Sequence, residues 1–202
     1  MNNLIITIGR EIGSGGLTLA ELLSKKLNIP YYDKRILTES AKQAGLNPKF
    51  FEKVDETVNK GFFRSTGVLC NEELFNIQCE TMRHIATKGS CIFVGRCADY
   101  ILEKDYHLLR IFIKSSIEER AKTIISKTDL NEEEALNKIK EVDKKRSEFY
   151  KYYSFRGWKD LSHYDLSFDS SIFPIEKISD IICGIYKELL FSINEKYSTK
   201  LK

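Results

Sequence analysis

Paired cysteines, clustered histidines and long apolar runs are all missing from this chain of 202 residues. Its five cysteines form no C-x-x-C pair, and its three histidines have no carboxylate or cysteine partner at ligand spacing. Neither a disulfide framework nor a metal site is therefore expected. No apolar run approaches the roughly 20 residues that a membrane helix needs. The net charge of +3 is too small to indicate a nucleic-acid surface.

What remains is an ordinary globular composition, 42% hydrophobic and 30% charged, in a chain long enough for one well-buried domain. Residues 1–3 are polar and a strand-like run follows at once. We therefore expect no secretory signal, no membrane partner and a cytoplasmic location. The sequence leaves open whether the protein forms a homodimer.

Strand-like and helical patterns alternate along the chain. The strand-like runs occupy residues 4–8, 31–32, 91–94, 108–113 and 164–168. The helical patterns occupy residues 17–27, 34–44, 72–88, 116–127, 132–152 and 174–191. This alternation predicts an α/β protein with a parallel sheet.

Two segments interrupt the alternation. Residues 34–89 contain helical patterns and no convincing strand, which predicts a helical insertion. Residues 131–163 are rich in lysine, arginine and tyrosine, and their apolar periodicity fades after Phe149. We expect the second segment to be a mobile, solvent-facing lobe. The core of a single domain would then comprise residues 1–33, 90–130 and 164–202.

A glycine-rich turn, Gly9 to Gly16, joins the first strand to the first helix. Such a turn binds phosphate through backbone N–H groups and the helix N-terminus. The P-loop pattern G-x-x-x-x-G-K-[ST] fits only in part. If Gly15 is its second glycine, Arg10 replaces the first glycine, Gly16 replaces the lysine and Leu17 replaces the Ser/Thr. Arg10 is then the local cation that compensates for the missing lysine.

Two other interpretations of the loop stay open at this point. One is a tight turn without a ligand, which three glycines within four residues disfavour because each costs roughly 0.5–1 kcal/mol of chain entropy. The other is a dinucleotide site: the G-x-x-x-G-x-G spacing fits, Asp33 falls about 20 residues on, and Tyr100 and Lys104 resemble a dehydrogenase catalytic pair. Residues 34–90 lack the β–α units that this second interpretation needs.

Six motifs in order resemble the cytidylate kinase-like family, across nearly the whole chain. They are ITIGREIGSGG, IPYYDKRILTESAKQAGL, IFVGRCAD, RIFIKSSIEERAKTI, DKKRSEFYKYYSFRGW and YDLSFDSS. The resemblance implies a P-loop NTPase fold, with a five-stranded parallel sheet flanked by helices. It also implies that residues 34–89 are a helical monophosphate-binding insertion and that residues 131–163 are a lid.

The activity that the resemblance implies is Mg²⁺-dependent transfer of the γ-phosphoryl group of ATP to a nucleoside monophosphate, with CMP or dCMP expected. Two alternatives stay open: a nucleotide-binding module without catalysis, and a kinase of another small metabolite. Cys97 departs from the Gly-Arg-Asp that the family has at its nucleotide site, which puts recognition of the base in doubt.

Candidate site residues follow from these motifs. For the acceptor substrate we expect Asp33 at a strand end, Arg96 after Gly95, and Asp99. For the donor nucleotide we expect Gly13, Ser14, Gly15, Gly16, Leu17, Thr18 and Arg120. For catalysis we expect the cations Arg10, Lys145, Arg146 and Arg156, because phosphoryl transfer needs charge neutralisation more than covalent chemistry. No residue is singled out as a metal ligand.

Overall fold

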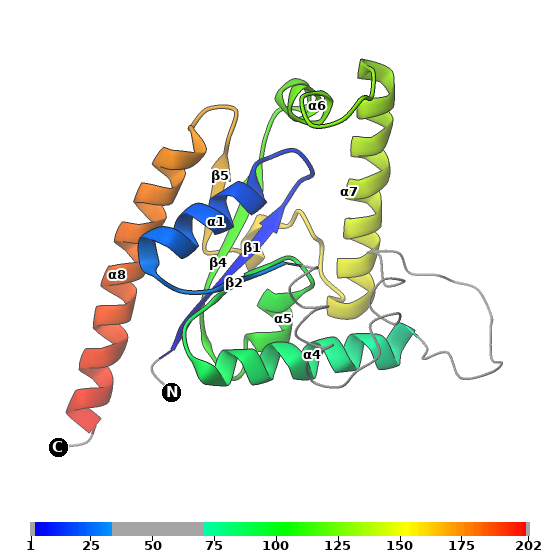
Figure 1. The fold of residues 1–202 in the computed structure, drawn as a ribbon. Helices are drawn as coiled ribbons and strands as arrows, with labels where there is room; N and C mark the ends of the chain where they lie inside the picture. The colour runs from blue at the N-terminus through cyan, green and yellow to red at the C-terminus, as the bar shows by residue number, and fades with distance from the viewer. Residues whose placement is uncertain (1–2, 34–70, 201–202) are drawn as a thin grey trace.

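Five parallel strands form one sheet in the order β2-β3-β1-β4-β5 in the computed structural model, which describes residues 3–33 and 71–200 (Figure 1). The strands are β1 (Leu4–Arg10), β2 (Tyr31–Tyr32), β3 (Ile92–Val94), β4 (His107–Lys114) and β5 (Leu166–Asp169). All five predicted strands are present, and no strand end differs from the prediction by more than two residues. The five-stranded parallel sheet is confirmed.

The central strand β1 pairs with β3 on one side and with β4 on the other, so that Ile8 lies opposite both Val94 and Ile111. Parallel pairing brings the carboxyl ends of β1 and β3 to the same edge of the sheet. Arg10 and Gly95, at or just past those ends, are therefore neighbours although they are far apart in sequence. In open α/β sheets ligands bind at this edge.

Two helices cover one face of the sheet: α1 (Gly16–Leu27) and the C-terminal α8 (Ile175–Lys200) (Figure 1). Alternate residues of β1 point toward them, and the resulting core contains Ile6 with Leu23 of α1 and Ile182 of α8. The helical patterns at 17–27 and 174–191 are confirmed, although α8 is longer than predicted.

The opposite face is covered by α4 (Asn71–Lys88), the short α5 (Ala98–Leu102) and the carboxyl half of α7 (Glu132–Ser154). Its core joins Phe93 and Phe112 of the sheet to aromatic side chains of α7. The helix α5 was not predicted, because five residues are too few to show a helical period.

The prediction that residues 131–163 form a solvent-facing lobe is wrong for several aromatic side chains of this segment. Phe149, Tyr150 and Trp158 are each 4% exposed and belong to the core beneath the sheet. Trp158 meets the ring of Phe112 edge-on, with ring centroids 5.6 Å apart. Aromatic residues dominate core energetics through the area they bury, so this segment is anchored to the sheet by its rings.

The remaining elements are α6 (Ile117–Ile125) and a short 3₁₀ turn, η1 (Leu161–His163). α7 begins at Glu132 as predicted, and α6 begins one residue later than predicted; their N-cap residues are Asn131 and Ser116. Within the described residues no helix is long and apolar enough to cross a bilayer. The predicted helix 34–44 and most of the predicted insertion lie outside the described residues.

Candidate active site

The glycine loop has the backbone that a phosphate site needs. Gly13 (φ +77°) and Gly15 (φ +84°) are both left-handed, and a Cβ on Gly13 would lie 2.8 Å from the carbonyl oxygen of Arg120. Gly15 is the N-cap of α1 and supplies no side-chain hydrogen bond. The N–H groups of the first turn of α1 therefore have no capping side chain and can bind an anion.

This loop borders a hollow of about 310 Å³ at the carboxyl edge of the sheet. Eight of the predicted site residues line it, Arg146 and seven others: Arg10, Gly13, Gly15, Gly16, Leu17, Thr18 and Asp33. Arg146 reaches the same hollow from α7. Ser14 does not line it, because its hydroxyl is buried and donates to the carbonyl oxygens of Glu11 and Ile113. Ser14 thus shapes the loop from below.

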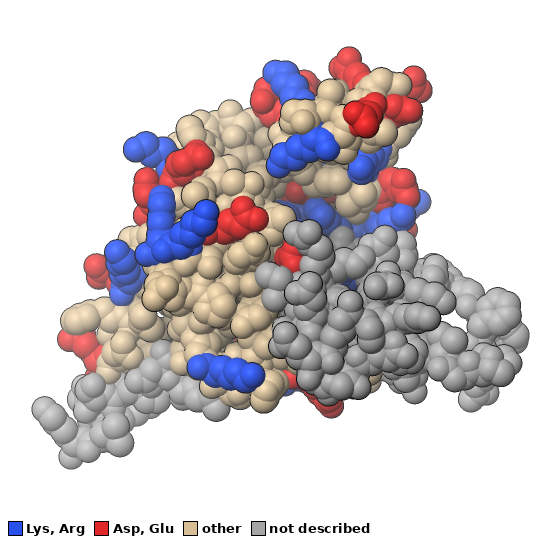
Figure 2. Space-filling view, in the orientation of Figure 1, with Lys and Arg blue, Asp and Glu red and all other residues tan. Residues whose placement is uncertain are grey.

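Two lysines that the sequence analysis missed also line this hollow, Lys127 just after α6 and Lys138 on α7. In the space-filling view, basic side chains lie within the recess between the α6–α7 end and the rest of the molecule (Figure 2). No motif in the sequence marks these two lysines. Only the fold brings them to the loop.

The turn after β3 has an unusual backbone. Gly95, Arg96 and Cys97 have φ angles of 75°, 61° and 57°, so three consecutive residues are left-handed. A non-glycine residue in this region costs of order 1–3 kcal/mol and persists at functional sites where its surroundings enforce it. The turn orients Arg96, whose guanidinium carbon lies 5.9 Å from the centroid of the Phe149 ring.

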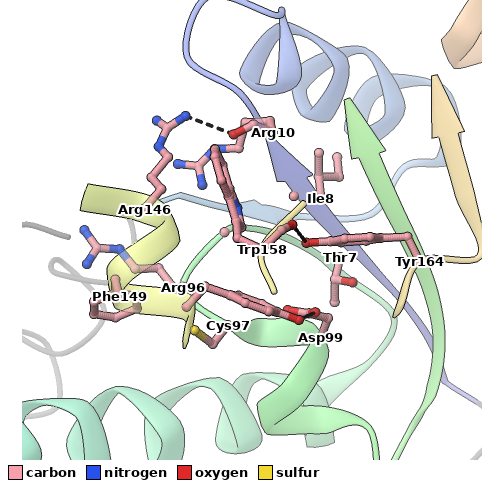
Figure 3. A pocket seen from close by; sticks show the side chains of 13 residues that line it. Thr7, Ile8, Arg10, Arg96, Cys97, Asp99, Arg146, Phe149, Trp158 and Tyr164 are labelled. Carbon is pink, nitrogen blue, oxygen red and sulfur yellow. Dashed lines mark hydrogen bonds between the residues drawn. The ribbon is translucent and has the colours of Figure 1, made fainter. Parts of the chain in front are cut away.

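Arg96, Arg10 and Arg146 line a second, narrow cavity of about 20 Å³ beside the first hollow. Their side chains come from three different elements and converge on the same end of the sheet (Figure 3). Arg146 donates a hydrogen bond from Nη1 to the carbonyl oxygen of Arg10, at 3.0 Å. Arg10 and Arg146 line both hollows, which makes these two arginines the link between them.

Polar groups are buried beneath this arginine cluster. Asp99 accepts a hydrogen bond from the hydroxyl of Tyr150, at 2.5 Å, and the hydroxyl of Tyr164 donates to the carbonyl oxygen of Trp158. Burial raises the pKa of Asp99 and, together with the nearby Asp99 charge, raises the pKa of Tyr150. Asp99 also lines the narrow cavity together with Arg96, and its carboxylate holds the hydroxyl of Tyr150 there.

A buried charge cluster connects the glycine loop to α6 and α7. Arg120 pairs with Glu11 and with Asp143, and its Nε donates to the carbonyl oxygen of Ile12 at 2.7 Å. Lys159 pairs with the other oxygen of Glu11. All the described contacts of Arg120 are with protein groups behind the loop, so the geometry points to a role in shaping the loop.

Two further predicted cations make ion pairs elsewhere on the surface. Arg156 holds both carboxylate oxygens of Glu103, at 2.7 and 2.9 Å, and lies over the ring of Tyr100. Lys145 pairs with Glu141 one turn earlier on α7. Neither residue lines the two hollows described above.

A parallel five-stranded sheet with a glycine loop between β1 and α1 is the arrangement of the P-loop NTPase fold. The chain belongs to the cytidylate kinase-like family, whose sequence profile matches residues 5–172. It is 30% identical over 189 residues to a protein named cytidylate kinase from Methanocaldococcus jannaschii, a match that covers 92% of this chain and 99% of the relative. Membership of this family makes the chain a nucleoside monophosphate kinase-like phosphotransferase.

Two solved structures share this fold. An uncharacterized protein from Eubacterium ventriosum superimposes with a TM-score of 0.73 at 28% identity, covering 90% of this chain and 97% of that one. A shikimate kinase from Bacteroides thetaiotaomicron superimposes with a TM-score of 0.55 at 12% identity, covering 92% and 98%. The second similarity shows the P-loop NTPase fold alone.

Proposed function

We propose that this chain transfers the γ-phosphoryl group of ATP to CMP or dCMP. One observation carries the proposal: the glycine-loop hollow and the arginine cavity share Arg10 and Arg146. A donor phosphate on the loop and an acceptor phosphate at Arg96 would meet between these two cations. The relatives named cytidylate kinase support a cytidine acceptor at the level of the family.

The donor triphosphate would bind along residues 13–18. Their backbone N–H groups and the N-terminus of α1 favour negative charge, and Lys127 and Lys138 add two cations at the same hollow. Leu17, at the position of the usual Ser/Thr, is 38% exposed and supplies no oxygen. The hydroxyl nearest to that role is Thr18, which also lines the hollow.

The residues at the hollow fit a Mg²⁺ that arrives with the nucleotide. Mg²⁺ binds through one or two protein oxygens, several waters and the substrate phosphates. Thr18 and Asp33 offer such oxygens, whereas no group of three or more His, Cys, Asp or Glu among the described residues could hold a metal ion. When bound, Mg²⁺ would neutralise charge on the phosphates.

In the proposed reaction an oxygen of the acceptor phosphate attacks the γ-phosphorus of ATP. A bond forms between them as the bond from the γ-phosphorus to the bridging oxygen of ADP breaks, which gives ADP and a nucleoside diphosphate. This transfer needs alignment and charge neutralisation. We assign Arg96 and Asp33 to the acceptor, and Arg10 and Arg146 to the moving phosphoryl group.

Lys145 and Arg156 remain proposals as further catalytic cations. Each would first have to leave its present carboxylate partner, Glu141 or Glu103. Closing lids deliver arginines to a phosphate and exclude water in this way. The present contacts give stronger support to Arg146, which already reaches the loop.

The test measures acceptor-dependent ADP formation from Mg-ATP with CMP, dCMP, UMP, AMP and shikimate. We expect CMP and dCMP to give the highest kcat/KM. Arg96→Ala and Arg146→Ala should each lower kcat/KM by about 10²–10³, the usual loss when one charge-stabilising group is removed. Arg83→Ala is the matched control, since Arg83 is a half-exposed arginine of α4 whose ion pair with Asp105 is 3.9 Å long.

The remaining outcomes each contradict a part of the proposal. Transfer to another acceptor, with none to CMP or dCMP, would show that the protein is a kinase whose acceptor substrate differs from the one proposed. Thermal stabilisation by ATP without transfer to any acceptor would instead indicate a nucleotide-binding module. If Arg83→Ala lowered activity as much as Arg96→Ala, the loss would not be specific to the narrow cavity, and the cavity would no longer support the proposed acceptor site.

A further inference from the structure

Two glycines from different elements leave room for a single side chain, that of Arg10. A Cβ on Gly16 would lie 2.6 Å from Cβ and 2.8 Å from Cγ of Arg10. A Cβ on Gly95 would overlap Nη1 of the same arginine. Real Cβ atoms do not make such contacts, so the stem of Arg10 lies against the start of α1 and its guanidinium lies against the end of β3.

Space, and not backbone conformation, accounts for glycine at position 16. Gly13 and Gly15 need glycine because their φ angles are positive, but Gly16 is not among the residues with positive φ. It is the first residue of α1, a position that any helix-forming residue adopts. The close approach of Arg10 gives a steric reason for glycine there.

Positions 10 and 16 are also the two places where this loop departs from the P-loop pattern, which has glycine at the first and lysine at the second. Here the residue types are exchanged: the cation is at position 10 and the glycine at position 16. We propose that the end of β1, instead of α1, carries the cation of the phosphate site, and that the side chain of Arg10 and a side chain at position 16 cannot both fit.

This position changes where the cation acts. A lysine on α1 would extend from the donor loop, whereas the guanidinium of Arg10 lies against Gly95, next to Arg96 (Figure 3). Arg146 holds the carbonyl oxygen of Arg10 and so fixes the same residue through its backbone. The catalytic part of the inference rests on the proposed phosphoryl transfer, and it places Arg10 between donor and acceptor.

The steric conflict between positions 10 and 16 is tested by measuring thermal stability, without any substrate. We expect Gly16→Ala to lower the melting temperature by about 2–4 °C or more, because its Cβ displaces Arg10. In the Arg10→Gly background, Gly16→Ala should be neutral or stabilising, since alanine favours a helix. Gly184→Ala, where a Cβ meets no atom within 4 Å, is the control and should have the same effect in both backgrounds. An equal effect of Gly16→Ala in both would contradict the steric conflict.

The proposed position of the cation at the end of β1 is tested by exchanging the residue types at positions 10 and 16. We expect Arg10→Gly to lower kcat/KM by about 10²–10³ and Gly16→Lys to lower it at least as far while also destabilising the fold. The double variant Arg10→Gly/Gly16→Lys restores the pattern G-x-x-x-x-G-K and should recover at least about tenfold over Arg10→Gly. A double variant no better than Arg10→Gly, in an active wild type, would overturn the proposed position of the cation.

The two experiments separate this inference from the proposed function. If the wild type transferred phosphate to no acceptor, the stability cycle would still decide whether positions 10 and 16 exclude one another. Thermal stabilisation by Mg-ADP, measured for the same variants, would then show whether Arg10 contributes to phosphate binding. Equal stabilisation of wild type and Arg10→Gly would count against Arg10 as a phosphate ligand, whatever the acceptor.

Discussion

The carboxylate of Asp143 accepts a hydrogen bond from the backbone N–H of Ile12, at 3.0 Å, across 131 residues of sequence. Its other oxygen pairs with Arg120, which also holds the carbonyl oxygen of Ile12. Arg146 lies one turn further along α7 and donates to the carbonyl oxygen of Arg10. The helix α7 is thus tied to the glycine loop at two points, and the loop and its arginine are positioned together.

Asp143→Ala should therefore destabilise the protein and weaken nucleotide binding together. We expect a loss of about 3 kcal/mol in the free energy of unfolding, the low end for breaking a buried pair, because Glu11 still pairs with Arg120. Urea unfolding and ATP titration measure the two effects. Asp129→Ala, at an exposed position after α6, is the control and should change neither. Unchanged ATP affinity in folded Asp143→Ala would show that α7 does not hold the glycine loop in its nucleotide-binding conformation.

Asp99→Asn should remove a pH dependence from stability. Burial raises the pKa of this carboxyl above its ordinary value of 3.8, so between these two pKa values the folded state binds more protons than the unfolded state. Stability contributed by this group therefore falls as pH rises through that window. Asparagine keeps an oxygen for the Tyr150 hydroxyl and carries no charge.

The measurement for Asp99 compares urea unfolding of wild type and Asp99→Asn from pH 4 upward. We expect the variant to gain stability relative to wild type as pH rises, and the gain to level off above the pKa of the folded state. Asp129→Asn should run parallel to wild type. A constant difference between Asp99→Asn and wild type at all pH values would contradict the raised pKa.

Asn131→Ala should loosen the start of α7. Asn131 accepts from the N–H of Glu134 at 3.0 Å, and the Glu134 carboxylate accepts from the N–H of Asn131 at 2.9 Å, which together form a capping box. Removing such a cap costs about 1 kcal/mol. Thermal unfolding measures it, with Asn137→Ala at an exposed interior position of α7 as the control. Equal melting temperatures for the two variants would argue against the cap.

Gly13→Ala should abolish nucleotide binding. Its φ of +77° is strained for alanine, and the new Cβ would lie 2.8 Å from the backbone carbonyl oxygen of Arg120, which cannot rotate away as a side chain can. We expect a loss of more than about 1 kcal/mol in the free energy of unfolding and no thermal shift with Mg-ATP. A folded Gly13→Ala protein that binds ATP normally would show that the loop is not the phosphate site.

The elements of this protein could be predicted from local patterns, because an apolar run such as 108–113 or a cap such as Asn131 acts through near neighbours. The segment around Phe149 could not. Phe149 and Tyr150 lie within the predicted helix 132–152, but only their packing against the sheet shows that they are buried. The short helix α5 could not be predicted either, because its five residues are too few to show a helical period.

The sequence by itself determined the glycine loop, the missing lysine and the candidate arginines, because motifs and spacing are properties of the chain. Tertiary structure decided which cations meet. It brought Arg10, Arg96 and Arg146 together from three elements, left Arg156 and Lys145 with carboxylate partners elsewhere, and assigned Arg120 to the support of the loop. The reason is that parallel pairing and the packing of α7 on the sheet set distances that residue spacing does not encode. One of them is the close approach of Arg10 to Gly16, where an added Cβ would lie 2.6 Å from the Cβ of Arg10.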